Sequence, residues 1–424
     1  MPDHIPTRPL EELATITMGQ SPESAMVNFN EQGLPFLQGC AEFGSRHPTA
    51  RLHCSPPLRV AKAGSTLISV RAPVGTTNRA DRDYCIGRGL GAVLARPDEA
   101  DDVFLLSAIE HGVGYLHRRS QGSTFLAIGS DDLRSMPVPA PAIDAQRWIA
   151  ELVSTVDEAI EQTEALIAKT QQIKAGLMND LFTRGVTPDG QLRPAREEAP
   201  KLYKESPLGW IPKDWESSHL HKVAEVRTGI AKNEGRVFSR PIAVQYLRVA
   251  NVQDGFLDLS EMKTVQIEAA DLERYRVLAG DVLMNEGGDL DKLGRGAVWA
   301  GSSEPCVHQN HVFVVRCGTA LLPVFLNAWT ATPIARRYFM VAGKQTTNLA
   351  SINKTQLGRL PVPIPPPQEQ SEIVRGLDVV DARLQADSQV AAKLRLLKAG
   401  VMHDLLTGRV RVPVAKSQKV AANV

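Results

Sequence analysis

At 424 residues the chain is longer than one hydrophobic core usually serves, so two or more domains are expected. Hydrophobic residues make up 43% of it and charged residues 22%, which excludes a disordered or fibrous protein. The net charge of +1 neither suggests nor excludes a polyanionic partner, and no apolar run approaches the roughly 18–20 residues of a membrane span.

The first residues, "MPDHIPTRPLEEL", lack the basic flank and apolar stretch of a secretory signal. Five cysteines are present, an odd number without a CxxC pair, and this is typical of buried free thiols in a reducing compartment. We therefore expect a cytoplasmic protein.

Residues 1–142 are predicted to form a first globular domain. Short alternating runs such as "STLISVRAPV" indicate strands, and "GQSPES" and "LQGCAEFGSR" are polar, glycine-containing stretches. Between residues 43 and 96, nine basic residues stand against two acidic ones. The basic residues are Arg46, Arg51, Arg59, Lys62, Arg71, Arg79, Arg82, Arg88 and Arg96. Arginine binds guanine edges and phosphates bidentately, so the window is a candidate site for a polyanion, but for one window alone a solvated basic face is the stronger explanation.

Residues 143–186 are predicted to form a long helix. Prolines 137, 139 and 141 lead into it, and they suit an extended segment that cannot be helical. Apolar residues then recur in steps of three and four, the a/d seam of a coiled coil. The seam residues are Ile149, Val153, Val156, Ile160, Ile167, Ile173, Leu177 and Leu181. From Ala145 to Phe182 the helix would be roughly 57 Å long at 1.5 Å per residue.

Residues 187–215 are polar and proline-rich, and we expect a surface linker there. Residues 216–366 are predicted to be a second globular domain, in which "NHVFVVRC" indicates a strand. Its window 227–248 contains five basic residues against one acidic residue, and "RVANVQDG" and "NEGGDLDKLGRG" are again polar and glycine-containing. A second basic window in the second domain makes a solvated face the weaker explanation.

Residues 367–410 are predicted to form a second long helix that repeats the first, followed by a flexible tail at 411–424. Over residues 136–186 against 360–410, 18 of 51 positions are identical without a gap. Chance would give about three at ordinary residue frequencies, so the chain contains an internal duplication. The seam continues at Ile373, Leu377, Val380, Leu384, Ala391, Leu394, Leu397, Val401 and Leu405.

The duplicated helices are expected to pair with one another, although each could instead lie on its own domain. Thr163 and Asp387 interrupt the two seams at the same place, where a polar residue can fix register. Gly176 and Gly400 lie inside the helices at a cost near 1 kcal/mol each relative to alanine. Close approach of the two backbones would explain these glycines, and an ordinary kink is the alternative.

Catalytic motifs are missing. The stretch "AGKQTTN" has the Gly-Lys of a phosphate-binding loop, but Gln345 stands where Ser or Thr would hold Mg²⁺. Cys306, His308, His311 and Cys317 match none of the usual zinc spacings. We therefore expect neither a metal site nor catalysis by this chain alone.

The sequence resembles the specificity subunits of type I restriction–modification systems. The resemblance rests on "LPVPIPPPQEQSEIV" leading into "LKAGVMHDLLTGRVRV", on the diverged first copy of both, and on "YKESPLGWIPKDW" before the second domain. It covers essentially the whole chain. The first copy departs from the family pattern at "AIDAQ" (142–146) and in "TRGV" for "TGRV", which we expect to weaken one partner contact.

The resemblance implies an α+β fold in which two long antiparallel coiled-coil helices separate two α/β target-recognition domains, with pseudo-two-fold symmetry. Each domain would read one half of a split double-stranded DNA site, with the helices setting the gap. Two methyltransferase subunits would dock on the helices and methylate adenine, and two restriction subunits would join indirectly. The resemblance implies that S-adenosylmethionine and ATP with Mg²⁺ bind to those partners and that this chain holds no cofactor.

Residue predictions follow for both surfaces. Candidates for contact with DNA bases are Gln38, Arg46, Arg71, Arg88, Arg248, Asn251, Lys292 and Arg295. For any single one of them, a phosphate contact or a surface salt bridge is the alternative. Helix-frame and partner-docking candidates are Gln146, Asp157, Lys174, Asp180, Gln370, Asp381, Lys398 and Asp404. Two other functions stay open: a targeting subunit for a methyltransferase without a restriction partner, and a non-enzymatic coiled-coil scaffold that binds DNA.

Overall fold

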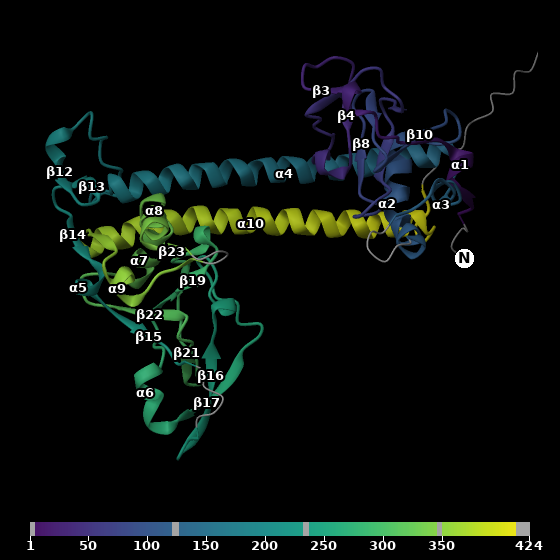
Figure 1. Ribbon diagram of the computed structural model, residues 1–424. Coiled ribbons are helices and arrows are strands. Elements are labelled where there is room, and N and C mark those ends of the chain that lie inside the picture. The colour runs from purple at the N-terminus through teal and green to yellow at the C-terminus, as the bar shows by residue number, and fades with distance from the viewer. Residues whose placement is uncertain (1–4, 121–126, 232–236, 346–349, 413–424) are drawn as a thin grey trace, which may run out of the picture. The chain divides into compact units, whose positions relative to one another are not determined.

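The computed structural model describes residues 5–120, 127–231, 237–345 and 350–412 (Figure 1). It divides into two compact units: unit 1 is Met1–Ala165 with Ser388–Val424, and unit 2 is Leu166–Asp387. Two long helices, α4 (Ile143–Thr183) and α10 (Pro367–Leu406), run through both units. Each unit therefore combines one globular domain with a part of each long helix. Both helices agree with those predicted from the seams.

The globular domain of unit 1 contains two main sheets. A four-stranded antiparallel sheet has the order β2 (Ala14–Met18), β10 (Leu90–Ala95), β7 (Thr66–Ser69) and β8 (Thr77–Arg79). A five-stranded sheet has the order β3 (Val27–Asn28), β5 (Leu52–Cys54), β4 (Leu34–Leu37), β9 (Tyr84–Ile86) and β6 (Val60–Ala61). Strands β4 and β9 are parallel, with Leu37 opposite Ile86.

Helix α2 (Asp102–Arg119) packs on the four-stranded sheet of unit 1. Asp101 begins it by accepting hydrogen bonds from the N–H groups of Val103 and Phe104, which satisfies two donors of the first turn. Phe104 and Ile109 then enter the same hydrophobic core as the sheet residues. The short helices α1 (Leu10–Leu13) and α3 (Ser130–Arg134) close this domain.

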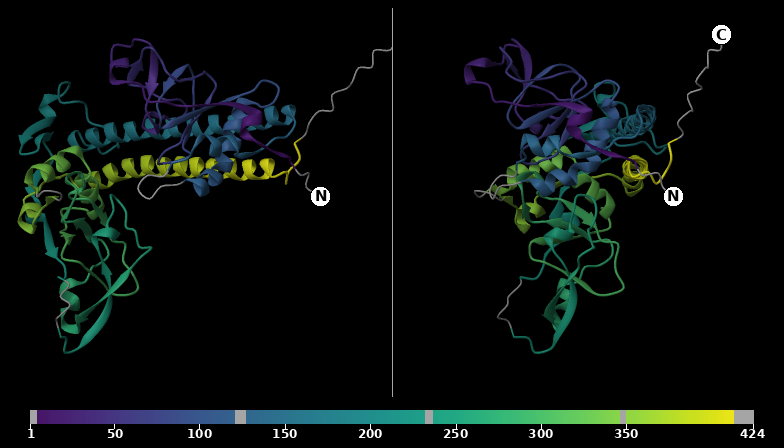
Figure 2. Two further views of the ribbon diagram at one scale, coloured as in Figure 1. Left: turned by 45° about the vertical axis from the view of Figure 1, so that its right-hand side comes forward. Right: turned by 90° about the vertical axis from the view of Figure 1, so that its right-hand side faces the viewer.

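The globular domain of unit 2, drawn in teal and green in Figures 1 and 2, also has a four-stranded antiparallel sheet and a second sheet with a parallel strand pair. Its antiparallel sheet has the order β15 (Ala224–Thr228), β22 (Val312–Cys317), β18 (Val282–Asn285) and β20 (Gly296–Val298). Its second sheet has the order β17 (Lys263–Glu268), β16 (Pro241–Leu247) and β21 (Cys306–His308). Strands β16 and β21 are parallel, with Leu247 opposite His308.

Helices α7 (Pro323–Thr330) and α8 (Pro333–Ala342) accompany the sheets of unit 2. Phe182 of α4 lies beside Phe325 and Trp329 of α7, with ring centroids 5.2 and 5.7 Å apart, so the long helix shares the core of this domain. The remaining short elements are α5 (Leu220–Val223), α6 (Leu272–Tyr275), α9 (Lys354–Gly358), β19 (Gly287–Gly288), β23 (Lys344–Gln345) and β24 (Ala350–Ser351).

The proline-rich segments before the long helices are extended, as predicted. In unit 1, β1 (Thr7–Pro9) pairs with β11 (Pro137–Pro139), and in unit 2, β14 (Glu216–His219) pairs with β25 (Pro361–Ile364). Within the described residues both sheets have two strands, so each proline strand has an edge without a neighbouring strand. The missing N–H groups of its prolines cost no hydrogen bond at that edge.

The two long helices are antiparallel within each unit. In unit 1, Lys398 Nζ lies 2.7 Å from Asp157 Oδ1, and Arg395 pairs with Glu164, so the order along α4 is reversed along α10. In unit 2, Lys174 pairs with Asp381. The duplication relates Asp157 to Asp381 and Lys174 to Lys398. Equivalent lysine–aspartate ion pairs therefore join the two helices in both units.

The predicted seam is wrong at one position in each helix. Ile173 and Leu397 are both 53% exposed, whereas Lys174 and Lys398 face the other helix. A lysine can bury its alkyl stem along the seam while its ammonium group reaches an aspartate, so the apolar residue next to it is displaced outward. Elsewhere the seam holds: Ile149 and Val153 are buried in unit 1, and Ile373 and Leu377 in unit 2.

The explanation offered for the helix glycines is also wrong. A Cβ atom built on Gly176 or on Gly400 would have no heavy atom within 4 Å among the residues that the structure describes. Close approach of α4 and α10 therefore does not require these glycines. Thr163 and Asp387, the predicted polar interruptions, bond within their own helices: Thr163 Oγ1 donates to Ala159 O, and Asp387 accepts from Arg383.

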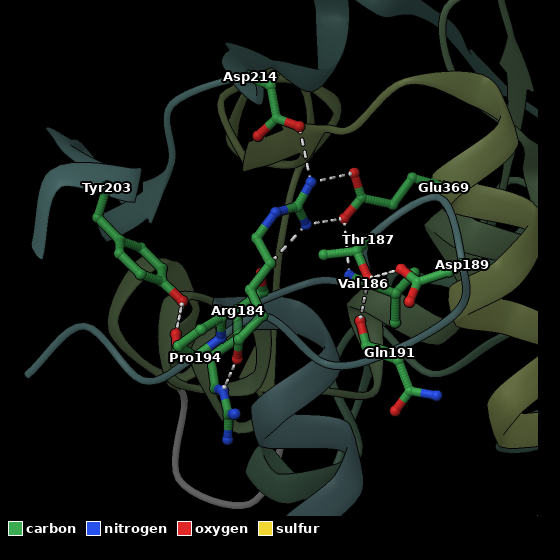
Figure 3. A network of polar contacts seen from close by, with 10 residues as sticks. Arg184, Val186, Thr187, Asp189, Gln191, Pro194, Tyr203, Asp214 and Glu369 are labelled. Atoms are coloured by element: carbon green, nitrogen blue, oxygen red, sulfur yellow. Dashed lines mark hydrogen bonds and ion pairs between the residues drawn. The ribbon is translucent and has the colours of Figure 1, made fainter. Parts of the chain in front are cut away.

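The segment predicted as a linker, 187–215, is anchored within unit 2 by a buried arginine, whose carboxylate partners Asp214 and Glu369 are labelled in Figure 3. Arg193 Nη2 lies 2.6 Å from Asp214 Oδ2 and 3.0 Å from Glu369 Oε2 near the start of α10. The side chains of Arg193 and Glu369 are each 9% exposed. The segment also forms a hairpin of β12 (Tyr203–Ser206) and β13 (Gly209–Pro212). Glu369 lies where the first copy has Ala145, so the departure in "AIDAQ" removes the carboxylate that binds the linker arginine in unit 2.

Candidate nucleic-acid interface and helix surfaces

Four strands of unit 1 end beside one another and form a surface that we call the first loop cluster. It consists of residues 19–21 after β2, Gln38 after β4, residues 70–71 after β7 and residues 87–89 after β9. Backbone hydrogen bonds join these loops. They run from Gln20 N–H to Ile86 O (3.0 Å), from Gly87 N–H to Leu37 O (2.8 Å) and from Val70 N–H to Gly89 O (2.9 Å). The cluster is therefore one connected surface.

The loops of this cluster pack too closely for side chains between them. A Cβ atom on Gly19 would lie 2.1 Å from the carbonyl oxygen of Gly87, so only glycine fits there. The side chains of the neighbouring residues are consequently turned outward. Gln20, Gln38, Arg71 and Arg88 are all exposed.

Three of the predicted DNA-contact residues meet in the first loop cluster: Gln38, Arg71 and Arg88. Neither guanidinium has a carboxylate partner among the described residues, so both are available to an external anion. Arg46, the fourth candidate in this domain, does not lie in the cluster. Its Nη1 atom is 3.3 Å from Glu161 Oε2 on α4.

Arg46 lines a cavity of about 570 Å³ in unit 1, together with Arg79, Glu110, Asp157 and Lys398. Unit 2 has a cavity of about 540 Å³ at the equivalent place, and it is lined by Lys174, Asp254, Asn327 and Asp381 among others. In each unit the interhelical lysine–aspartate pair forms part of the wall. Both units therefore have a cavity at the equivalent place beside the long helices.

The predicted residues of unit 2 are more dispersed. Asn251 is 2% exposed, and its amide accepts from Arg248 N–H (2.9 Å) and donates to Asp258 O (2.8 Å). Its side chain therefore holds a loop and is not available to DNA bases. Lys292 pairs with Asp289. Arg295 is half-buried, and its Nε atom has no hydrogen-bond partner among the described residues. Lys232 and Arg236 of the basic window lie outside the described residues.

Arg248 lies in a second loop cluster, where four strands of unit 2 end. This cluster consists of Ile230 after β15, Arg248 after β16, Glu286 after β18 and residues 309–311 after β21. His311 Nδ1 lies 2.6 Å from Glu286 Oε2, and the histidine ring is 57% exposed. Gln20, Asn310 and His311 also lie in the two clusters, and none of them was among the predicted DNA-contact residues. Gln20 lies in the quoted "GQSPES", so the signal for it was present.

Two glutamines of the predicted frame attach each long helix to its own domain. Gln146 accepts from Asp101 N–H (3.0 Å) and donates to Pro141 O (2.9 Å). Gln370, its repeat, accepts from Leu322 N–H (2.8 Å) and donates to Pro365 O (2.8 Å). Both are buried, at 2% and 0% exposed, so these side chains serve the frame rather than an external surface.

The other frame candidates are charged residues of the helices. Asp157, Lys174, Asp381 and Lys398 form the two interhelical ion pairs. Asp180 lies 3.5 Å from Arg184 and Asp404 lies 3.9 Å from Arg409, so these two carboxylates pair locally at the helix ends.

The cysteine and histidine group of unit 2 lies in and beside its sheets. Burial raises the pKa of Cys306 to about 12, and burial lowers the pKa of His308 to about 4. His308 Nδ1 lies 2.6 Å from the carbonyl oxygen of Val312 and is its donor when protonated. No three His, Cys, Asp or Glu side chains converge on a metal-sized site within the described ranges. No helix of those ranges is long and apolar enough to cross a bilayer.

A family model described as the type I restriction modification DNA specificity domain matches residues 3–172 and 212–395. The chain belongs to this family. The two matched segments correspond to the two halves of the duplication, so the specificity-domain fold occurs twice in the chain. The resemblance identified from the sequence is confirmed, and so is the predicted fold class of two α/β domains with long antiparallel helices.

Curated relatives of this specificity-domain chain are specificity subunits. A putative type I restriction enzyme MjaX specificity subunit from Methanocaldococcus jannaschii is 39% identical over 176 residues, which is 41% of each chain. The MjaVIII specificity subunit of the same organism is 23% identical over 74% of this chain and 71% of its own. The EcoBI specificity subunit of Escherichia coli is 19% identical over 87% of this chain and 77% of its own.

Solved structures share the fold. The S subunit of a type I restriction–modification system from M. genitalium is 14% identical with a TM-score of 0.55, and the match covers 94% of this chain and 95% of that one. A chain from a structure on complex assembly of a type I restriction–modification system is 16% identical with a TM-score of 0.58, over 97% and 99%. At such low identity these matches concern the fold of the specificity subunits.

Proposed function

We propose that this chain is the DNA-recognition subunit of a type I restriction–modification complex. Each globular domain binds one half of a split double-stranded DNA site, and the long helices set the gap between the halves. The observation that carries the proposal is the family match to both halves of a duplicated chain. The exposed arginines of the first loop cluster support it, because guanidinium groups without internal partners suit phosphates and guanine edges.

The proposed partners are two methyltransferase subunits, one for each copy of the helix. Support comes from exposed apolar residues at equivalent positions of the two copies. In unit 2, α4 exposes Leu166 (39%) and Ile173 (53%), and in unit 1, α10 exposes Val390 (46%) and Leu397 (53%). Gly176 and Gly400 lie three residues beyond Ile173 and Leu397. Two restriction subunits join this assembly indirectly.

Exposed small and apolar residues on both helices suit the approach of a partner helix, since glycine lets a foreign backbone come close. Two identical partners need two equivalent surfaces, and a single chain supplies them by carrying the frame twice.

Catalysis belongs to the partners in this proposal. The chain provides sequence recognition and spacing, while S-adenosylmethionine, ATP and Mg²⁺ bind to the methyltransferase and restriction subunits. The sequence supports this division because it has no convincing phosphate-binding loop and no glycine-rich motif for S-adenosylmethionine.

The test is a genome-wide map of methylated adenines in the source cell with and without this gene. We expect the deletion to abolish methylation at one split motif made of two short half-sites around a fixed gap. An unchanged map, together with no salt-dependent DNA binding by the purified chain, would overturn the proposal. Methylation without restriction of unmethylated DNA would instead identify a targeting subunit that has no restriction partner. Salt-dependent DNA binding without any change in methylation would favour the non-enzymatic scaffold.

A further inference from the structure

The two loop clusters share a pattern of backbone hydrogen bonds although their sequences differ. In unit 1 Gln20 N–H donates to Ile86 O (3.0 Å), and in unit 2 Ile230 N–H donates to His308 O (2.8 Å). The other shared hydrogen bonds form three pairs. The N–H of Gly87 donates to Leu37 O in unit 1, as that of Gln309 does to Leu247 O in unit 2. Likewise, Val70 donates to Gly89 O and Glu286 to His311 O. Leu90 donates to Gly87 O and Val312 to Gln309 O.

These shared hydrogen bonds define which positions correspond. Leu37 and Leu247 end the equivalent strands β4 and β16, and both strands pair in parallel with the strand that precedes the last loop. The corresponding loop positions are therefore Gln20 and Ile230, Gln38 and Arg248, Arg88 and Asn310, Gly89 and His311, and Arg71 and Gly287. At all five positions the residue types differ.

Both clusters are built with the same restraint on the backbone. A Cβ atom on Gly229 would lie 2.1 Å from His308 O, just as one on Gly19 would lie 2.1 Å from Gly87 O. The loops can therefore not accept side chains between them in either unit. A constant backbone with variable outward side chains is what two domains need when they read different short sequences on similar DNA.

We propose that these strand-end positions determine the base specificity of each domain, an inference that rests on the proposed function. In the first domain the reading residues are Gln20, Gln38, Arg71 and Arg88. In the second domain they are Arg248, Asn310 and His311. Arginine forks onto guanine, and glutamine or asparagine onto adenine, from the major groove.

The environment of the second cluster supports these assignments. The side-chain amide of Asn310 has no hydrogen-bond partner among the described residues, so both of its groups are available to a base edge. Glu286 bonds the Nδ1 atom of His311 and so fixes the ring, which leaves Nε2 for an external partner. Arg248 Nη2 donates to Glu261 O at 3.1 Å and lies 3.6 Å from Glu261 Oε2, so Glu261 orients this guanidinium, whose side chain is 22% exposed.

The test is selection of bound sequences from a randomised duplex library by the full-length chain, purified with its methyltransferase subunits. Wild-type protein is expected to enrich a split motif. Arg88→Ala or Gln38→Ala should relax one base position in one half-site, with a loss of discrimination of about tenfold or more, and leave the other half-site unchanged. Asn310→Ala should relax a position in the opposite half-site. Arg88→Asn, which copies the second domain, should change the preferred base.

The matched control is Arg82→Ala, because Arg82 is an exposed arginine of the same domain whose guanidinium pairs with Asp81. It should leave the enriched motif unchanged. Variants that keep the full wild-type motif, or that weaken binding to every sequence alike, would overturn the inference while the proposed function stands. Absence of any enriched split motif with the wild-type complex would overturn the proposed function itself. Unchanged thermal unfolding of each variant shows that its fold is intact.

Discussion

Lys174 and Asp381 pair across the two long helices of unit 2, and the internal repeat carries this pair onto Lys398 and Asp157 in unit 1. In each pair, one copy of the repeated helix supplies the lysine and the other copy supplies the aspartate. The lysine and aspartate were therefore duplicated together with the helix, and each pair requires both copies. An antiparallel arrangement is the only one in which a single helix sequence satisfies both pairs.

This relationship predicts a measurable coupling between Lys174 and Asp381. Removing either side chain should lower the free energy of unfolding, but only modestly, because the two side chains are 31% and 49% exposed and water screens them. A double-mutant cycle with Lys174→Ala and Asp381→Ala should give a coupling of about 0.5–1 kcal/mol that shrinks as salt is added. Lys169→Ala, on an exposed part of the same helix, is the control and should show no coupling to Asp381.

The buried arginine of the linker predicts a larger effect. Arg193→Met should lower the free energy of unfolding by about 3–5 kcal/mol, because it leaves the carboxylate of Glu369 buried without its partner. The double variant Arg193→Met with Glu369→Leu should be more stable than Arg193→Met alone. Urea unfolding of the full chain measures both. If the single and double variants lose the same stability, the pair is not coupled as the contacts indicate.

His308 predicts that acid weakens unit 2. The folded state lowers its pKa from about 6.5 to about 4, mainly by burial, so between these values the unfolded chain binds the extra proton and the folded chain does not. Stability is therefore complete above pH 6.5 and is lost as the pH falls toward 4. From pH 7 to pH 5 this should amount to about 2 kcal/mol, which His308→Gln should largely abolish.

Unit 1 serves as the internal control for His308, because Ile86 occupies the equivalent position there. Unfolding followed by hydrogen exchange should show the acid-sensitive step in strands β16 and β21 of unit 2, and not in β4 and β9 of unit 1. Equal acid sensitivity of both strand pairs would assign the effect to other groups.

The exposed helix residues predict that stability and partner binding can be separated. Gly176→Ala should raise the free energy of unfolding of the isolated chain by about 0.5–1 kcal/mol, because the new methyl group meets nothing in the chain and alanine is the better helix former. Ile173→Asp should leave the isolated chain folded, since this side chain is 53% exposed.

In the presence of the methyltransferase, Ile173→Asp should reduce the number of bound subunits from two to one per chain under the proposed function. Native mass spectrometry counts them directly. Leu397→Asp should have the same effect at the other copy, and the double variant should bind none. Two bound subunits in the double variant would show that the partners use another surface.

The sequence predicted the helices well because a duplication reports on both copies at once. The sequence pattern places Ile173 and Leu397 in the seam instead of Lys174 and Lys398, because a seam is predicted from apolar residues in steps of three and four. Only tertiary contacts show that a lysine reaches an aspartate of the other helix there. Asn251 was chosen because asparagine can fork onto adenine, but the same amide can also close a short loop. The loop clusters depend on strands far apart in sequence, so Arg46 could not be separated from Arg71 and Arg88 by composition.

The division of the long helices between the units has a consequence for synthesis of the chain. Unit 2 is one continuous segment, whereas the core of unit 1 includes Met402, Leu405 and Leu406 near the end of α10. At about 5–20 residues per second, the ribosome makes these residues roughly ten to fifty seconds after it finishes the rest of that core. The domain that is translated first is thus completed last. During that interval the apolar surface of this domain, including Ile149 and Val153, is not yet covered by the final turns of α10. Protection by chaperones therefore matters most for this domain.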